Sequence, residues 1–374
     1  LRALGVPGAD FRIGLSAHDL AGALGAPEVV LSRSERDEAG PAIPSRFLLR
    51  VQALLGELLD RYEDRETVAL ARAMTRAPSA PAYPRPAPQP QPEQRKVDIS
   101  ATALDRLLGD PYQFYADRIM GLKDLDALDA EPSAQWQGTV AHTILQRWHE
   151  TRERDPAAPL APIMQAVLDE ENADPLMRGL WQPRLEAALR WIEEEIGAYD
   201  DRRVLAVEKH GAMTFDGVHV HGRADRLDRL ADGSLAIIDY KTGTPPSAAR
   251  VEAGFALQLG VLGLIAERGG FEGLAGDAQG YEYWSLGKAK DAENRFGFGY
   301  VDVPLKVGRK TSGVAPEEFL PLTADKLTLA INRFIKGNDS FTARENPDYP
   351  AYDTYDQLMR LDEWIAHQDG GETA

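Results

Sequence analysis

Two strand-like runs joined by a short turn constrain the fold of this chain more than any other feature. Residues 217–226 and 234–241 have the side-chain patterns of β-strands, and the Asp232-Gly233 pair between them is typical of a hairpin turn. The second run is apolar until Asp239, where charged residues begin. Such a strand leaves an apolar core and ends at an open edge of a sheet. The sequence therefore predicts a β-hairpin that brings charged side chains to this edge.

Two carboxylates and a lysine lie near the ends of these runs. Asp225 is in the first run and Asp239 is in the second, where Lys241 shares its strand face because side chains alternate. Carboxylates held close together repel each other unless a cation lies between them, and their oxygens suit Mg²⁺ or Mn²⁺. A lysine beside such a cation can offset charge that develops on a phosphate. The pattern predicts a metal-dependent phosphodiesterase with Asp225, Asp239 and Lys241 as catalytic residues.

The length of the hairpin loop decides whether these side chains can meet. A two-residue turn at Asp232-Gly233 would place Asp225 opposite Tyr240, on the wrong face for Asp239. An odd loop length or a β-bulge restores the parity. We therefore predict a loop of about three or five residues, or a bulge, between the two strands.

Three further polar residues are candidates for the same site, and each has a purely structural alternative. His142 lies on a predicted helix, where a histidine often donates to a carbonyl. Gln258 interrupts an apolar helix and can be a buried amide bonded to backbone. Glu208 is placed at a strand end, either supporting a metal ligand or merely exposed. Taken singly, these residues do not define a site.

Net charge limits how the chain can meet nucleic acid. At pH 7 the formal charge is −17, which argues against DNA binding driven by charge alone. A nuclease with this composition needs metal ions and a local basic groove at the phosphates, or a partner subunit that grips the DNA. We expect dependence on a partner.

The composition also limits redox and membrane chemistry. The absence of cysteine excludes disulfides, thiolate zinc sites and cysteine-ligated iron–sulfur clusters. The sequence has no apolar run long enough to span a bilayer and no evident signal peptide. We expect a cytoplasmic protein without membrane contact.

The 374 residues favour two domains, and a proline-rich stretch at 77–94 is the natural spacer between them. Before it we predict strands at 11–15 and 28–31 and a helix from about Ser45. After it we predict the following elements: helices from Ser100 to 108, at 136–150, 181–198, 247–268 and 322–335, and strands at 204–208, 217–226, 234–241 and 280–286.

In combination, these motifs resemble a known family. A Gly-x-x-x-His142 helix, a Gly-Arg-x-Asp225 strand, an Asp239-Tyr-Lys241-Thr-Gly strand end and Gln258 on the next helix occur in that order. This order resembles the RecB-type nuclease branch of the PD-(D/E)xK superfamily. Segments 100–115 and 341–364 are similar to the C-terminal part of alphaproteobacterial AddB proteins, and 1–76 to the end of their helicase-like region.

The resemblance implies a fold and a domain division. The fold is α/β, with a restriction-endonuclease-like central mixed β-sheet flanked by helices and preceded by a small α/β helicase-like remnant. Residues 1–76 correspond to the C-terminal remnant of the helicase-like domain, 77–96 to a proline-rich linker, and 97–374 to the RecB-like nuclease domain.

The resemblance also implies roles for the site residues. Its metal ligands, for Mg²⁺ or Mn²⁺, are His142, Asp225, Asp239 and the Tyr240 carbonyl. Lys241 is its catalytic lysine, and Gln258 supports the active site or the DNA backbone.

The implied activity is exonucleolytic hydrolysis of DNA on a displaced single strand. It belongs to an AddAB-type helicase–nuclease with an AddA-like partner, in double-strand-break repair and recombination. An inert strand-guiding scaffold and a stand-alone exonuclease are the alternatives. The chain has no G-K-[ST] phosphate loop, so by itself it does not hydrolyse ATP.

One departure from the family pattern concerns four cysteines that hold an iron–sulfur cluster in many AddB proteins. The first would lie near Asp110, and the chain has none. We expect packing of Pro111, Tyr112 and the aromatic residues near 349–355 to replace the cluster.

Overall fold

The computed structural model describes residues 9–37, 40–76, 83–123, 125, 134–171, 179, 181–199, 202–274, 276–290, 296–308, 312–350 and 352–368. The chain divides into two compact units, Leu1–Pro81 and Ala82–Ala374. In the described residues, no helix has both the length and the apolar surface needed to cross a bilayer.

The first unit is mostly helical. Its elements are α1 (Ala9–Ala23), β1 (Arg36–Asp37), β2 (Gly40–Pro41), α2 (Arg46–Leu55), a 3₁₀ turn (Gly56–Leu58), α3 (Leu59–Tyr62) and α4 (Arg65–Met74). The strands predicted at 11–15 and 28–31 are wrong: the first lies inside α1 and the second is irregular. Alternation over five residues is too short to override a run rich in helix formers. The predicted helix start is confirmed, because Ser45 Oγ accepts from Phe47 N.

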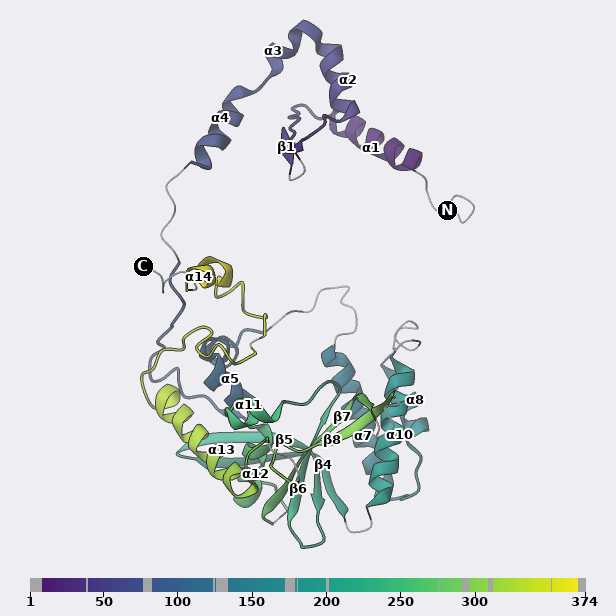
Figure 1. The fold of residues 1–374 in the computed structure, drawn as a ribbon, viewed down its shortest axis with the longest axis vertical. Coiled ribbons are helices and arrows are strands. Elements are labelled where there is room, and N and C mark those ends of the chain that lie inside the picture. The colour runs from purple at the N-terminus through teal and green to yellow at the C-terminus, as the bar shows by residue number, and fades with distance from the viewer. Residues whose placement is uncertain are drawn as a thin grey trace. The chain divides into compact units, whose positions relative to one another are not determined.

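The second unit is built around a six-stranded mixed sheet (Figure 1). Its strands are β3 (Ile99–Ser100), β4 (Arg203–Phe215), β5 (Val218–Arg229), β6 (Leu235–Lys241), β7 (Ala278–Lys290) and β8 (Phe296–Asp302). The main order is β3-β5-β6-β7-β8, and β4 pairs with β5. The β3–β5 and β6–β7 pairs are parallel and the others antiparallel. The predicted α/β fold with a central mixed sheet is therefore confirmed.

Helices cover both faces of this sheet (Figure 1). On one face lie α5 (Ala103–Gly109), α12 (Gln258–Glu267) and α13 (Pro316–Ala330), whose apolar side chains join Ile237 in one core. On the other lie α7 (Ala134–Arg152), α8 (Leu160–Glu170) and α10 (Gln182–Ala198), which join Ile238 in a second core. Because both faces of β6 are covered, its apolar run needs no alternation.

Shorter elements complete the second unit. They are α6 (Pro111–Phe114), a π-helix (Tyr115–Ile119), α11 (Ala248–Glu252), a second π-helix (Ile331–Ile335) and α14 (Leu361–Gln368). The single helix predicted at 247–268 is wrong, because α11 and α12 are separate. The chain turns between them at Gly254, whose φ of +83° suits glycine. This break makes Gln258 the first residue of α12.

The hairpin loop has the predicted odd length. The last paired residues of β5 and β6 are Arg229 and Leu235, which leaves a five-residue loop at 230–234. The prediction of a three- or five-residue loop is confirmed. As a result, Asp225 lies level with Asp239 rather than with Tyr240.

The proline-rich stretch is not a free spacer along its whole length. Proline carbonyls accept hydrogen bonds from a late segment: Phe341 N donates to Pro88 O (2.9 Å) and Ala343 N to Pro86 O (2.8 Å). Arg95 is buried and donates to two further carbonyls of this region. From Tyr83 on, the predicted 77–96 linker therefore belongs to the second unit.

The predicted packing of Tyr112 with the aromatic residues near 349–355 is present. Tyr112 shares a small apolar cluster with Tyr355, and the ring of Tyr349 packs against Gly109. Buried Asp110 accepts from Arg344 N at 3.0 Å. These contacts join the segment after α5 to the C-terminal region.

Close helix packing between α12 and α13 depends on a glycine. A Cβ at Gly260 would lie 2.1 Å from the buried Thr323 Oγ1. We expect Gly260→Ala to lower the free energy of unfolding by about 1–3 kcal/mol, because the overpacked helices must separate. Gly197→Ala in α10 is the control, since a Cβ there meets open space. Urea unfolding of both variants checks this, and equal stability of Gly260→Ala and the unaltered protein would contradict it.

Candidate metal centre

Three carboxylates lie in a row across adjacent strands. The antiparallel registers of β4 with β5 and of β5 with β6 place Glu208 opposite Asp225 and Asp225 opposite Asp239. Their side chains are only 7%, 9% and 3% exposed, respectively. Buried like charges at neighbouring positions need compensating cations. This row therefore needs positive charge nearby to offset the repulsion among its three carboxylates.

His142 of α7 reaches the row from the side. Its Nδ1 lies 3.0 Å from Glu208 Oε1 and 3.7 Å from Asp225 Oδ1, and its Nε2 lies 3.2 Å from the Tyr240 carbonyl oxygen. Burial alone would lower the pKa of His142, but the hydrogen bond to Glu208 and the nearby carboxylates raise it to about 9. His142 therefore contacts a backbone carbonyl, as the structural alternative expected, but it also contacts two carboxylates.

Asp225 is the middle carboxylate of the row. Burial and the charge of Asp239 raise the pKa of Asp225 to about 7, although His142 and the Tyr240 N–H oppose the shift. The Tyr240 N–H donates to Asp225 Oδ2 at 2.7 Å. A carboxylate in these surroundings gains from a nearby cation.

Lys241 and Gln258 hold Asp239. Lys241 Nζ lies 2.6 Å from Asp239 Oδ2, and Gln258 Nε2 donates to Asp239 Oδ1 at 2.7 Å. Lys241 Nζ also donates to Gln258 Oε1 at 3.3 Å, so the amide bridges the ion pair. Burial favours a lower pKa for Lys241, but Asp239 outweighs it and raises the pKa. The ammonium stays charged, and Gln258 bonds side chains rather than backbone.

The sequence predicted Glu208 at a strand end, either as a support for a metal ligand or as an exposed residue, and the strand-end placement was wrong. It lies within β4, with a φ of +48° that is costly for a residue other than glycine. Its second oxygen pairs with Arg223 Nε at 2.8 Å. The sequence could indicate Glu208 only through its position relative to Asp225. That position becomes informative only when the register of β4 on β5 is known.

The donor set fits a divalent cation. His142, Glu208 and Asp225 offer ligand atoms that all lie within 4.8 Å of one another, and the described part of the chain contains no second such group. Imidazole and carboxylates together suit Mn²⁺, and the carboxylates suit Mg²⁺. The Tyr240 carbonyl adjoins this group through His142, while the Asp239 carboxylate contacts Lys241 and Gln258.

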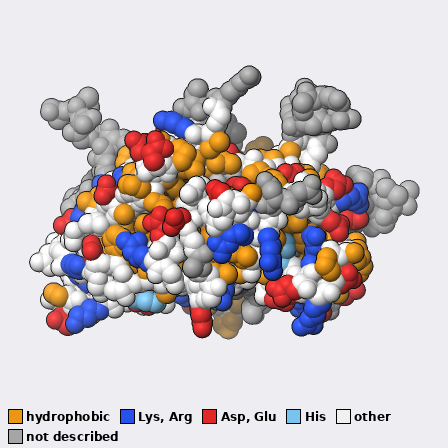
Figure 2. All heavy atoms as spheres, turned by 90° about the horizontal axis from the view of Figure 1, so that it is seen from below, with side chains coloured by type: hydrophobic (Ala, Val, Ile, Leu, Met, Phe, Trp, Pro, Cys, Tyr) orange, Lys and Arg blue, Asp and Glu red, His pale blue; other side chains and the backbone are white. Residues whose placement is uncertain are grey.

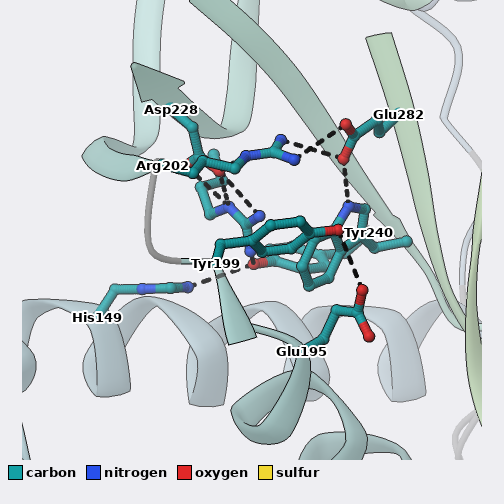
Figure 3. A network of polar contacts seen from close by, with 9 residues as sticks. His149, Glu195, Tyr199, Arg202, Asp228, Tyr240 and Glu282 are labelled. Carbon is teal, nitrogen blue, oxygen red and sulfur yellow. Dashed lines mark hydrogen bonds and ion pairs between the residues drawn. The ribbon is translucent and has the colours of Figure 1, made fainter. Parts of the chain in front are cut away.

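The ring of Tyr240 lies in a buried polar network (Figure 3). Its hydroxyl accepts from Arg226 Nη1 at 2.8 Å and lies 3.3 Å from His149 Nε2. Burial, followed by the charge of Arg226, lowers the pKa of His149 to about 3, so the ring beside the Tyr240 hydroxyl is neutral. These bonds fix a residue whose N–H and C=O both contact the candidate centre.

Ion pairs extend the same network across three strands. Arg226 donates to Asp228, and Arg202 bridges Asp228 Oδ2 (2.7 Å) and Glu282 (3.0 Å) (Figure 3). The Arg226 guanidinium also lies 4.0 Å from the ring centre of Trp284, whose Nε1 donates to Glu282. Each buried charge in this group thus has an opposite charge beside it.

Asp105 supports Gln258 from a neighbouring helix. Its Oδ1 accepts from Leu257 N at 2.9 Å, directly before α12 begins. Burial raises the pKa of Asp105 to about 7. Because the folded pKa exceeds the unfolded value, ionisation of Asp105 costs stability progressively as the pH rises from about 4 to about 7.

We expect Asp105→Asn to raise the free energy of unfolding at pH 8 by on the order of 2 kcal/mol, because the amide keeps an acceptor and removes the charge. At pH 4 the gain should vanish, since the carboxyl is then protonated in the folded state. Urea unfolding at both pH values tests this. A variant that is less stable than the unaltered protein at pH 8 would contradict the argument.

Comparison with known proteins gives a family and several relatives. The family described as "PD-(D/E)XK nuclease superfamily" matches residues 98–354. An uncharacterised protein of Rickettsia conorii is 26% identical over 186 residues, which are 46% of this chain and 22% of that protein. A protein of Streptococcus uberis, named as the B subunit of an ATP-dependent helicase/deoxyribonuclease, is 25% identical over 155 residues, 39% of this chain and 14% of that protein. The chain thus spans less than a quarter of the length of these relatives.

Proposed function

Since this chain belongs to the PD-(D/E)XK nuclease superfamily, we propose that its second unit is a divalent-metal-dependent deoxyribonuclease domain. The observation that carries the proposal is the buried row of Glu208, Asp225 and Asp239, with Lys241 paired to Asp239 and His142 beside Glu208. A buried row of like charges has no structural benefit, whereas hydrolysis of a phosphodiester needs a cation site.

In this proposal His142, Asp225, Asp239 and the Tyr240 carbonyl hold the metal, and Glu208 is an added ligand candidate. When bound, Mg²⁺ or Mn²⁺ supplies Lewis acidity to the phosphate and to the attacking water. The Tyr240 N–H orients Asp225, and the buried network behind Tyr240 keeps its peptide in place.

Lys241 has the role of offsetting negative charge on the phosphate while water attacks phosphorus and the bond to the leaving oxygen breaks. Gln258 orients the ammonium through its side-chain oxygen and orients Asp239 through its side-chain nitrogen. A fixed ammonium needs no reorganisation during the reaction. Gln258 is therefore a positioning residue for both groups.

The cellular setting belongs to the same proposal. We infer an AddB-type subunit that acts with an AddA-like helicase–nuclease in double-strand-break repair, cutting a displaced strand from its end. Relatives named as the B subunit of an ATP-dependent helicase/deoxyribonuclease support this. The charge of −17 also supports it, because an acidic protein attracts DNA poorly and a partner would supply much of the DNA contact. Acidic and basic side chains are interspersed over the face in Figure 2. Residues 1–76 would then be the helicase-like remnant.

Cleavage by the purified chain tests the proposal. End-labelled single-stranded DNA is incubated with Mg²⁺, with Mn²⁺ or with EDTA, and the products are resolved by length. We expect cutting with metal, none in EDTA, and at least about a 100-fold slower rate for Lys241→Ala, because the charge on the phosphate is no longer offset.

Lys209→Ala is the matched control, because this lysine lies in β4 outside the proposed site and should keep its rate. Cutting that persists in EDTA or in Lys241→Ala would contradict the proposal. DNA binding without cutting in either metal would favour the inert scaffold.

A further inference from the structure

A small cavity with aromatic and basic walls lies beside the candidate centre. Its volume is about 210 Å³, and it forms where α7, α10 and the ends of β6, β7 and β8 meet. Six of its lining residues carry the argument: Gln137, Trp181, Arg184, Thr242, Lys288 and Phe298. Thr242 directly follows the proposed catalytic Lys241, so the cavity begins one residue from the site.

A second cavity, of about 280 Å³, contains His142 and Glu208. The first turn of α7 separates the two cavities: Gln137 lines the aromatic cavity, and Gly138 lines the one at the metal ligands. A Cβ at Gly138 would still lie 3.9 Å from Thr242 Oγ1, so this turn has room to spare on the side of Thr242. The two cavities thus lie on either side of the neighbouring α7 residues Gln137 and Gly138.

The walls of the aromatic cavity suit the base and the phosphate of a nucleotide. Trp181 and Phe298 are half-buried, and Trp181 packs on Trp136 with ring centres 5.6 Å apart, which steadies it as a stacking surface. Aromatic rings of this kind stack on bases of any sequence. Unlike Lys241 and Arg223, which pair with carboxylates, Arg184 and Lys288 have no ion-pair partner among the described residues.

We propose that this cavity binds one nucleotide of single-stranded DNA next to the phosphodiester to be cut. The base stacks on Trp181 and its phosphate meets Arg184, while Phe298 and Lys288 complete the walls of the cavity. Among the described residues that line the cavity none carries a carboxylate, so a phosphate meets no opposing charge from them. A base in a duplex is paired and stacked and cannot enter, which gives preference for single strands. The inference rests on the proposed nuclease function and adds its substrate site.

Binding in EDTA tests this inference apart from catalysis. The anisotropy of a fluorescein-labelled oligo-dT reports single-strand affinity, and the same oligonucleotide in a duplex is the comparison. We expect Trp181→Ala to weaken single-strand binding roughly tenfold, with Trp181→Phe retaining affinity and duplex binding unchanged. Thermal unfolding of each variant confirms that it is folded.

The basic wall has its own test, which does not depend on Trp181→Ala being folded. Arg184→Gln should lower the slope of log affinity against log salt by roughly 0.7, the value for one phosphate contact on a single strand. Arg190→Gln is the matched control, because Arg190 lies on the same helix but pairs with Glu186 outside the cavity. Its slope should stay unchanged.

Two results would overturn the inference: unchanged single-strand affinity in Trp181→Ala, or equal loss of single-strand and duplex binding with equal slopes for both arginine variants. Failure of the nuclease proposal has a different signature. In that case the chain would bind single strands through Trp181 and yet cut nothing with Mg²⁺ or Mn²⁺.

Discussion

Replacing Asp239 by asparagine is expected to slow metal-dependent DNA cleavage by roughly 100- to 1000-fold, the range for losing one preorganised electrostatic group. The asparagine would keep the size of the side chain and an acceptor for Gln258, but it would remove the charge that faces Lys241 at 2.6 Å. It would also remove one of the proposed metal ligands. Both effects fall on the reacting phosphate rather than on the core.

Single-turnover cleavage of single-stranded DNA with Mg²⁺ measures this effect, and thermal unfolding shows whether the fold is kept. Asp232→Asn is the matched control, because Asp232 lies in the exposed hairpin loop, where it accepts hydrogen bonds from Ser234. Its rate should equal that of the unaltered protein. If Asp239→Asn cut DNA within about threefold of the unaltered rate, too small a loss for a preorganised charge, the assignment of Asp239 would fail.

The second large effect is on stability. Arg226→Met should lower the free energy of unfolding by about 3–5 kcal/mol, because it leaves the buried Asp228 with one cation in place of two. It also removes the donor to the Tyr240 hydroxyl and the guanidinium over Trp284. The variant therefore loses contacts with residues of β5, β6 and β7.

Urea unfolding of Arg226→Met, compared with Arg190→Met, checks this prediction. Arg190 forms an exposed helix ion pair, and its loss should cost only about 0.5 kcal/mol. The double variant Arg226→Met/Asp228→Leu should regain part of the lost free energy of unfolding, because it also removes the buried carboxylate that had lost one of its cations. Similar stabilities of the two single variants would show that the network contributes little.

The hairpin and its charges follow from the sequence because strand alternation and loop parity are local rules. Asp225, Asp239 and Lys241 lie on strands that are neighbours in the chain, so a five-residue loop is enough to bring them together. The mixed sheet with helices on both faces also follows from the family resemblance. These parts of the fold and of the candidate site were predictable.

Other features depend on contacts between distant segments. Glu208 joins the row only through the register of β4 on β5 and a positive φ, neither of which its neighbours in sequence specify. The break before Gln258 at Gly254 was hidden by an apolar run that continues through it. The partners of the proline-rich stretch lie more than 200 residues away, as in the Arg85 to Ala343 hydrogen bond. Periodicity alone cannot identify such partners.

The bonds between the stretch from Tyr83 and the segment around Phe341 have a practical consequence for making shortened proteins. The superfamily match begins at residue 98, which is where a recombinant fragment would ordinarily be cut. That cut would discard the carbonyls of Pro86 and Pro88 and leave the N–H groups of Phe341 and Ala343 without acceptors. It would also delete the buried Arg95 side chain. A fragment for crystallisation or enzymology should therefore start upstream of Tyr83.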